Sequence, residues 1–277
     1  MTNLIVLRGG GDLASGVALR LHRTGFQVVI LELEKPLAVR RSVSFSEAVY
    51  EGVQTVEGTT ARLVSPDQIQ VTLELNEIPV LVDPQASILR NQFLTSPRST
   101  FVVDARLLKT KPEPLDVNIP LHIGLGPGFT AGENCHAVIE TRRGHTMGRV
   151  YWSGSAQADS GEPEGDRRRV LRASHNGVLI ADSQIGDQLE EGQLIAEIQP
   201  EEGGDNYSIL SPFKGVLRGL IRPGILVTRD LKIGDVDRRN DPAICTFVSD
   251  KALAVGGAVL EVLLIYKKQS ESSSSGI

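Results

Sequence analysis

Two glycine-dense segments are the parts of this sequence whose residue types and spacing best suit ligand chemistry. The first fits the G-x-G-x-x-A form of the dinucleotide fingerprint and consists of Gly9, Gly10, Gly11, Asp12 and Ala14. Glycines there permit a tight turn and a close approach of the backbone to a pyrophosphate, and the following helix offers unpaired N–H groups. We therefore expect these residues to bind a nucleotide or dinucleotide. The alternative is a tight turn that binds nothing.

Three carboxylates follow apolar runs that are typical of strands. Glu32, Asp83 and Asp104 each come directly after such a run. The carboxyl ends of parallel strands form one rim of a sheet, where ligands bind. We expect these carboxylates, with Arg8 and Arg106 nearby, to hold a ribose, a cation or a polar substrate. In the alternative interpretation they only cap the helices that follow.

The second glycine-dense segment runs from Gly124 to Gly132 and includes Gly126 and Gly128. Its backbone amides could wrap around an anion, so Gly126 and Gly128 join the predicted cofactor-binding residues. The arginine clusters at residues 142–143 and 167–169 could bind phosphate, although most such clusters are solvated faces.

The grouping of Cys135, His136 and His145 could bind zinc or supply a nucleophile with its base. Adjacent residues on a strand point to opposite faces, so Cys135 and His136 cannot both reach one site on a regular strand. A buried cysteine beside a structural histidine is the favoured interpretation. We therefore predict no metal site, and the sequence assigns no catalytic residue.

Continuous apolar runs predict the sheet that would position these residues. Residues 4–7, 28–31, 79–82 and 101–103 are typical of parallel strands buried on both faces, and residues 13–21 carry apolar side chains at helical spacing. Strand, glycine loop, helix and strand form a βαβ unit. The sequence therefore predicts an α/β fold with a Rossmann-like parallel sheet.

The C-terminal third contains an internal repeat. Residues 176–179 match residues 214–217 at an offset of 38, and Gly186 matches Gly224 at the same offset. Residues 170–237 resemble the barrel-sandwich hybrid of biotinyl and lipoyl carrier domains, which predicts an all-β module. Where that family carries its modified lysine, this chain has glycines, so we expect no biotin or lipoyl attachment.

These patterns predict five regions along the chain. They are a Rossmann-like nucleotide-binding domain (1–115), a glycine-rich loop with a β-hairpin and linker (116–168), a barrel-sandwich hybrid module (169–240), a C-terminal strand or helix (241–268) and a disordered tail (269–277).

Composition limits the classes of partner. The chain has 277 residues, a net charge of -5 and two distant cysteines. A mildly acidic protein is a poor candidate for nucleic-acid or membrane binding, because both require a strong basic field. No signal peptide or membrane span is recognisable, and free cysteines suit a reducing compartment, so a cytoplasmic location is expected.

Motifs along nearly the whole chain resemble the selenium-dependent molybdenum hydroxylase system protein family, whose N-terminal unit is similar to xanthine dehydrogenase accessory factors. They lie at residues 8–16, 21–26, 36–50, 124–137, 144–150, 233–239 and 249–253. One departure is Asp237-Arg238-Arg239, where the family often has Asp-Pro-Arg. The resemblance implies an accessory protein that matures a molybdenum hydroxylase client and binds a nucleotide-bearing form of its cofactor.

Two other functions stay open at this point. A free-standing NAD(P)-dependent oxidoreductase would need a general acid or base such as His136 or Asp104, and no dehydrogenase motif supports it. A non-catalytic scaffold would use the glycine turns for structure alone. Whether the chain is an enzyme is therefore left undecided.

Overall fold

The computed structural model describes residues 3–90, 100–161 and 165–274. Its α-helices are α1 (Asp12–Arg23), α2 (Ala48–Glu51), α3 (Ile69–Glu74) and α4 (Asp250–Ser274). Short 3-10 helices are η1 (Arg41–Val43), η2 (Phe45–Glu47), η3 (Pro66–Gln68), η4 (Ser87–Arg90), η5 (Arg167–Arg169) and η6 (Pro242–Cys245).

One large mixed sheet organises the first unit, in the order β10-β9-β7-β6-β1-β2-β5-β4-β3. Its strands are β1 (Leu4–Arg8), β2 (Gln27–Glu32), β3 (Val53–Val56), β4 (Thr59–Leu63), β5 (Ile78–Val82), β6 (Thr100–Asp104), β7 (His122–Leu125), β9 (Ala137–Ile139) and β10 (Val150–Tyr151). The strands from β9 to β4 run parallel, whereas the edge strands β10 and β3 run antiparallel to their neighbours. The β-hairpin predicted within residues 116–168 is confirmed as β9 and β10.

Successive side chains of β1 point to opposite faces of this sheet and belong to two separate core clusters. Ile5 and Leu7 pack with α1 and α4 on one face, whereas Leu4 and Val6 pack with α3 and η4 on the other. A further pair of short strands, β8 (Thr130–Ala131) and β11 (Gly154–Ser155), lies beside the β9 edge.

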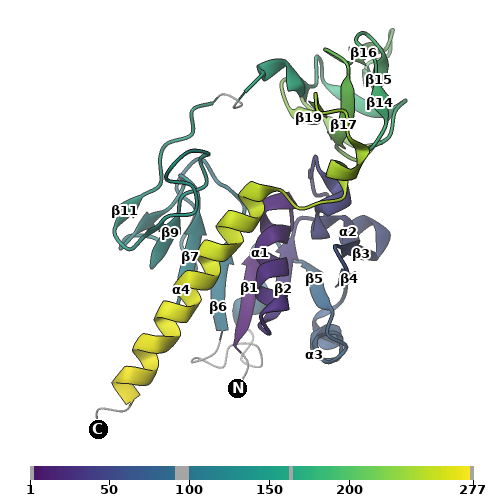
Figure 1. Cartoon of the computed structure of the whole chain (residues 1–277). Helices are drawn as coiled ribbons and strands as arrows, with labels where there is room; N and C mark the ends of the chain where they lie inside the picture. The colour runs from purple at the N-terminus through teal and green to yellow at the C-terminus, as the bar shows by residue number, and fades with distance from the viewer. Residues whose placement is uncertain (1–2, 91–99, 162–164, 275–277) are drawn as a thin grey trace.

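Small residues let α1 and α4 pack very closely across the first face (Figure 1). A Cβ on Gly16 would lie 2.6 Å from the Cβ of Ala252, and one on Gly256 would lie 2.9 Å from the Gly16 carbonyl oxygen. Of the strand or helix expected within residues 241–268, the structure shows the helix α4, which packs the end of the described chain against α1 near its beginning.

Two four-stranded antiparallel sheets form the second unit around a separate core. Their strands are β12 (Val170–Arg172), β13 (Gly177–Ala181), β14 (Gln188–Leu189), β15 (Leu194–Gln199), β16 (Tyr207–Leu210), β17 (Gly215–Leu220), β18 (Leu226–Val227) and β19 (Lys232–Asp237). The three strands β13, β14 and β15 recur 38 residues later as β17, β18 and β19. β13 pairs with β18, and β17 pairs with β14, so the predicted repeat is present and its copies exchange strands.

The fold class expected from the sequence is corrected by this topology. A Rossmann sheet joins its successive parallel strands by helical crossovers, but here the described residues 105–121, which connect β6 to β7, contain no helix. The connection from β2 to β5 includes the β3–β4 hairpin instead of one crossover helix. The chain is an α/β protein with a large mixed sheet and two additional antiparallel sheets, not a Rossmann domain joined to a biotinyl/lipoyl-like module.

Two expected boundaries also differ from the observed elements. The large sheet continues past residue 115 through β7, β9 and β10. Helix α4 extends to Ser274, so residues 269–274 are helical where we expected a disordered tail, and residues 275–277 lie outside the described residues. In the described part of the chain, no helix has both the length and the apolar character needed to cross a membrane.

Side-chain contacts hold the first and second units together. The Arg41 Nε donates to the Leu220 carbonyl oxygen at 2.7 Å. The Arg222 guanidinium lies 2.6 Å from carboxylate oxygens of both Glu47 and Glu51, and it stacks on Tyr50.

Candidate functional site

The glycine loop before α1 is held by the carboxylate at the end of β2. Glu32 accepts the Gly10 N–H at 2.6 Å and the Leu33 N–H at 2.7 Å, one on each oxygen. Burial raises the pKa of Glu32, and the two backbone N–H groups oppose that shift. Glu32 therefore already has a structural task that holds the loop against β2.

The segment after residue 43 covers the same loop. The Gly10 carbonyl oxygen accepts the Ser46 N–H at 2.8 Å and the Ser15 hydroxyl at 3.1 Å. A Cβ on Gly10 would lie 2.9 Å from the Ser46 nitrogen, and Gly9 has φ +94 beside Ala105. Both glycines are thus explained by close packing and backbone conformation.

The other two predicted carboxylates also make contacts inside the fold. Asp104 is fully buried and pairs with Arg8 at 3.2 Å and with Arg106 at 2.6 Å. Asp83 accepts the N–H groups of Ser87 and Ile88 at 2.9 and 2.8 Å, which caps η4. Ala14 is buried in the core of the first unit.

The second glycine-dense segment serves packing. A Cβ on Gly128 would lie 2.6 Å from the carbonyl oxygens of Leu108 and Thr110. Gly126 has φ +88, and a Cβ there would lie 3.1 Å from the Thr141 hydroxyl. Glycine is therefore required at both positions without any ligand.

The cysteine and histidine group has no reactive arrangement. Burial raises the pKa of the Cys135 thiol to about 11, so it stays protonated near neutral pH. The His136 Nδ1 accepts the His122 backbone N–H at 2.9 Å. No cluster of three or more potential metal ligands occurs among the residues that the structure describes.

A cleft of about 560 Å³ lies where the start of α1 meets the second unit. Gly11 and Asp12 line it, whereas the other eight predicted site residues do not. Among its described lining residues, nine are Lys or Arg and three are Asp. The basic residues are Arg40, Lys109, Arg142, Arg143, Arg169, Arg172, Arg218, Lys232 and Lys251, and the acidic residues are Asp12, Asp159 and Asp235.

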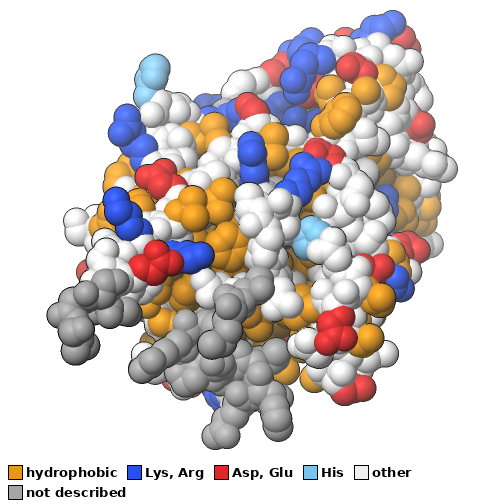
Figure 2. Space-filling model, turned by 60° about the horizontal axis from the view of Figure 1, so that its bottom comes forward, with side chains coloured by type: hydrophobic (Ala, Val, Ile, Leu, Met, Phe, Trp, Pro, Cys, Tyr) orange, Lys and Arg blue, Asp and Glu red, His pale blue; other side chains and the backbone are white. Residues whose placement is uncertain are grey.

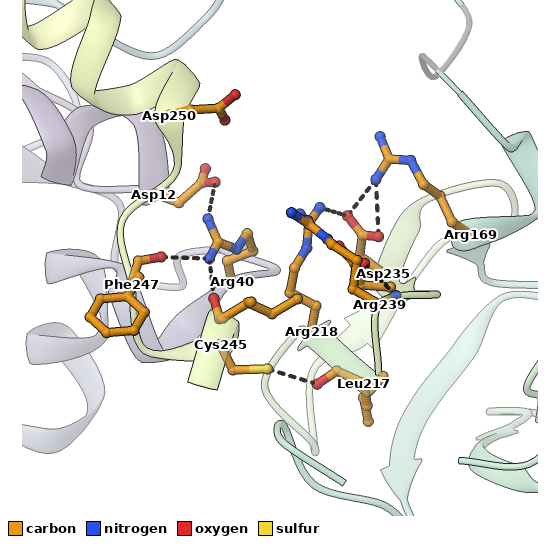
Figure 3. A network of polar contacts seen from close by, with 12 residues as sticks. Asp12, Arg40, Arg169, Leu217, Arg218, Asp235, Arg239, Cys245, Phe247 and Asp250 are labelled. Atoms are coloured by element: carbon orange, nitrogen blue, oxygen red, sulfur yellow. Dashed lines mark hydrogen bonds and ion pairs between the residues drawn. The ribbon is translucent and has the colours of Figure 1, made fainter. Parts of the chain in front are cut away.

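The floor of the cleft joins α1 to the segment that leads into α4 (Figure 3). The Arg40 guanidinium lies 3.6 Å from the Asp12 carboxylate and donates to the carbonyl oxygens of Ile244 and Phe247. Arg40 is 7% exposed, and its Nε has no hydrogen-bond partner. Gly11 opens onto free space, since a Cβ there would meet nothing within 4 Å.

One wall of the cleft is built by the second unit around a buried carboxylate (Figure 3). Asp235 receives Arg169 at 2.8 Å and Arg218 at 2.5 Å, and the Lys232 Nζ lies 4.0 Å away. Burial lowers the pKa of Lys232. Asp237 also lies 3.4 Å from Arg218, so three cations here face two carboxylates, which leaves this wall with an excess of positive charge.

The other wall belongs to the first unit and its linker. Lys109 pairs with Asp159 at 2.6 Å, and the Arg142 Nη1 donates to the Gln157 amide oxygen at 3.3 Å. The Arg143 guanidinium pairs with Asp250 and holds the pKa of that carboxyl at about 2. On the face shown in Figure 2, basic side chains are interspersed with acidic and apolar ones.

Most of these cations had no signal in the sequence. Arg172 precedes the first copy of the repeat, Arg218 and Lys232 lie in the second copy, and the three form no motif. The arginine clusters at residues 142–143 and 167–169 were noted as potential phosphate contacts, and three of their members, Arg142, Arg143 and Arg169, line the cleft.

Comparison with known protein-family models finds no match. A protein of Escherichia coli (strain K12) called uncharacterized protein YqeB is 44% identical over 280 residues, which cover 99% of this chain and 50% of that protein. The chain therefore spans about half the length of the curated relative it matches.

Among solved structures, an aspartoacylase family protein of Mesorhizobium loti is 10% identical, with a TM-score of 0.28 and coverage of 86% of this chain and 85% of that chain. The ectoine utilization protein EutE of Ruegeria pomeroyi is also 10% identical at a TM-score of 0.28, covering 85% of this chain and 86% of that chain. At these TM-scores the likeness carries no argument about the activity of this chain.

The function expected from the sequence is corrected by the covered glycine loop and finds no support in the relative. The relative is called uncharacterized, so its name gives no support for molybdenum hydroxylase maturation. The loop expected to bind the nucleotide is covered by Ser46 and held by Glu32. The covered glycine loop, with Glu32 engaged by Gly10, also removes the geometric basis for the nicotinamide alternative. Neither function is carried further.

Proposed function

We propose that this chain binds a small polyanion in the cleft between α1 and the second unit. The observation that supports it is the excess of Lys and Arg over Asp among the described lining residues. Positive groups that enclose a cleft raise the local concentration of anions and form charge-assisted hydrogen bonds with carboxylates and phosphates. The cleft volume falls in the range of small-molecule sites.

Two further features support an anionic ligand. Arg40 and Arg218 are part of the lining and add their guanidinium charges to it. The N-terminal end of α1 also reaches the cleft at Gly11 and Asp12, and a helix N-terminus carries a partial positive charge. The Asp12 carboxylate opposes this charge locally, so the basic walls supply most of the attraction.

Titration calorimetry with pyrophosphate and citrate at low salt tests the proposal. We expect both to bind, and we expect binding to weaken as salt rises, because salt screens charges that solvent can reach. Lys232→Gln should weaken binding about tenfold, on the order of 1.5 kcal/mol for one charged contact. Lys267→Gln, on the exposed side of α4, is the matched control and should bind like the unchanged protein.

Failure of both anions to bind at low salt would contradict the proposed function. An equal loss of affinity in Lys232→Gln and Lys267→Gln would also contradict it, because the change in net charge alone would explain that result.

A further inference from the structure

We propose that the ligand carries two separated anionic groups, one held by each wall of the cleft, with an uncharged centre between them. This inference rests on the proposed function, since it specifies how the charges of the polyanion are spaced. It follows from how the cations and their described partners are distributed over the two walls and the floor.

The wall from the first unit presents Arg142, which comes from the segment just after β9. Its guanidinium is exposed and donates to the uncharged amide oxygen of Gln157 at 3.3 Å. A neutral acceptor does not cancel the charge of an arginine, so this guanidinium can still take a carboxylate or phosphate oxygen.

The wall from the second unit presents Arg172 at the end of β12 and Lys232 at the start of β19. The Arg172 Nη1 donates to the carbonyl oxygen of Asp230 at 2.7 Å, which is again a neutral acceptor. The Lys232 Nζ lies 4.0 Å from Asp235, beyond hydrogen-bond distance, and Arg169 and Arg218 already contact that carboxylate. This wall therefore offers a second place for an anionic group.

The floor between the walls does not suit a third anion. Asp12 balances Arg40 there at 3.6 Å, and its carboxylate would repel a negative group. The cleft lining also includes the apolar residues Leu13, Leu37, Ala38, Val39, Leu107 and Pro127. An uncharged, partly apolar centre fits this floor.

The two walls come from different sheets, so a ligand with one anionic group can be held fully by one wall only. β9 belongs to the large sheet, whereas β12 and β19 belong to the second unit (Figure 1). A ligand of the right length gains the second contact within one molecule, which raises affinity without a second association step.

Two series of linear compounds test this inference by calorimetry: α,ω-dicarboxylates and α,ω-bisphosphonates of increasing length, each with a one-ended acid of the same length. We expect one intermediate length in a series to bind at least tenfold tighter than its one-ended counterpart. A preference for bisphosphonates assigns phosphate-like ends and a preference for dicarboxylates assigns carboxylate ends; both support the inference.

Arg142→Gln and Arg172→Gln probe the walls separately. Each should weaken the best two-ended compound about tenfold, whereas a one-ended compound should respond strongly to only one of the two substitutions. Arg229→Gln, at an exposed position of the second unit, is the matched control and should leave affinity unchanged.

Equal affinity of one-ended and two-ended compounds would overturn the inference and leave the proposed function intact. The same holds if only one of Arg142→Gln and Arg172→Gln weakens binding of the best two-ended compound. If neither compound series, pyrophosphate nor citrate binds, the proposed function itself fails. The two failures are therefore distinguishable in the same set of titrations.

Discussion

Buried carboxylates in this protein have different tasks according to whether their cationic or N–H partners face a cleft. Glu32 and Asp104 are buried, and each is bound by groups of its own unit, a pair of backbone N–H groups or a pair of arginines. Asp235 is buried too, but its cations face a cleft. Removing a buried carboxylate leaves its partners uncompensated, so these side chains are required for folding whatever the ligand.

The buried side chain of His122 makes the stability of the fold depend on pH. Burial lowers its pKa from the ordinary 6.5 to about 4, because the charged imidazolium is poorly solvated inside the protein. As pH falls through 6.5, the unfolded chain takes up this proton before the folded chain does. The stability linked to His122 is therefore complete above pH 6.5 and falls toward pH 4, by about 3 kcal/mol.

Urea unfolding at a series of pH values checks this prediction. His122→Gln should flatten the fall in unfolding free energy between pH 6.5 and 4, whereas the exposed His145→Gln should keep it. An unchanged slope in His122→Gln would show that other groups cause the acid sensitivity.

At the scale of elements, the contact between α1 and α4 decides how the two ends of the chain meet. Gly16 and Gly256 leave no side chain at the crossing, so the helix backbones approach one another directly. This packing anchors the residues at the start of α1 that reach the cleft, Gly11 and Asp12. A loose crossing would shift the cleft floor relative to its walls.

Substitution of Gly16 by alanine tests the crossing. A Cβ there would lie 2.6 Å from the Ala252 Cβ and 2.9 Å from its carbonyl carbon, so α4 must move. We expect a loss of about 1–3 kcal/mol of unfolding free energy in urea titration, despite the better helix propensity of alanine.

Gly257→Ala is the control on α4, because a Cβ there meets nothing within 4 Å. It should raise stability by up to about 1 kcal/mol through helix propensity alone. Similar stabilisation by both substitutions would contradict the close crossing.

At the scale of the whole molecule, the cleft exists because two independently cored units are held at a fixed distance. Gly219 in β17 lies against Val39, where a Cβ would come within 2.8 Å of the Val39 carbonyl oxygen. Arg222 adds ion pairs to Glu47 and Glu51 from the second unit. Neither unit alone presents both basic walls.

Gly219→Val should separate the units without unfolding them. We expect faster hydrogen exchange across residues 39–51 and 217–222, with an unchanged far-UV circular dichroism spectrum, because bulk at β17 opposes docking. Ser208→Val, on an exposed position of β16, is the control and should leave exchange unchanged. Unaltered exchange in Gly219→Val would mean that the contact does not hold the units together.

Local pattern in the sequence was enough to predict many of the elements. Continuous apolar runs predicted β1, β2, β5 and β6, helical spacing predicted α1, and the 38-residue offset predicted the strands of the second unit. These features depend on periodicities within a few residues, which survive in any tertiary context. The absence of biotin and lipoyl attachment stays a prediction that rests on Gly203 and Gly204.

Only the tertiary structure decided how the elements combine and which residues share a site. The glycine fingerprint alone could not reveal that Ser46 covers Gly10 or that Glu32 turns back to bind it, because both contacts bridge more than 20 residues. The sheet is mixed because its edge strands β10 and β3 pair antiparallel with their neighbours. Helix α4, from the far end of the chain, covers one face of this sheet. The residues that line the basic cleft are spread from 11 to 251, so no local pattern in the sequence could predict it as one site.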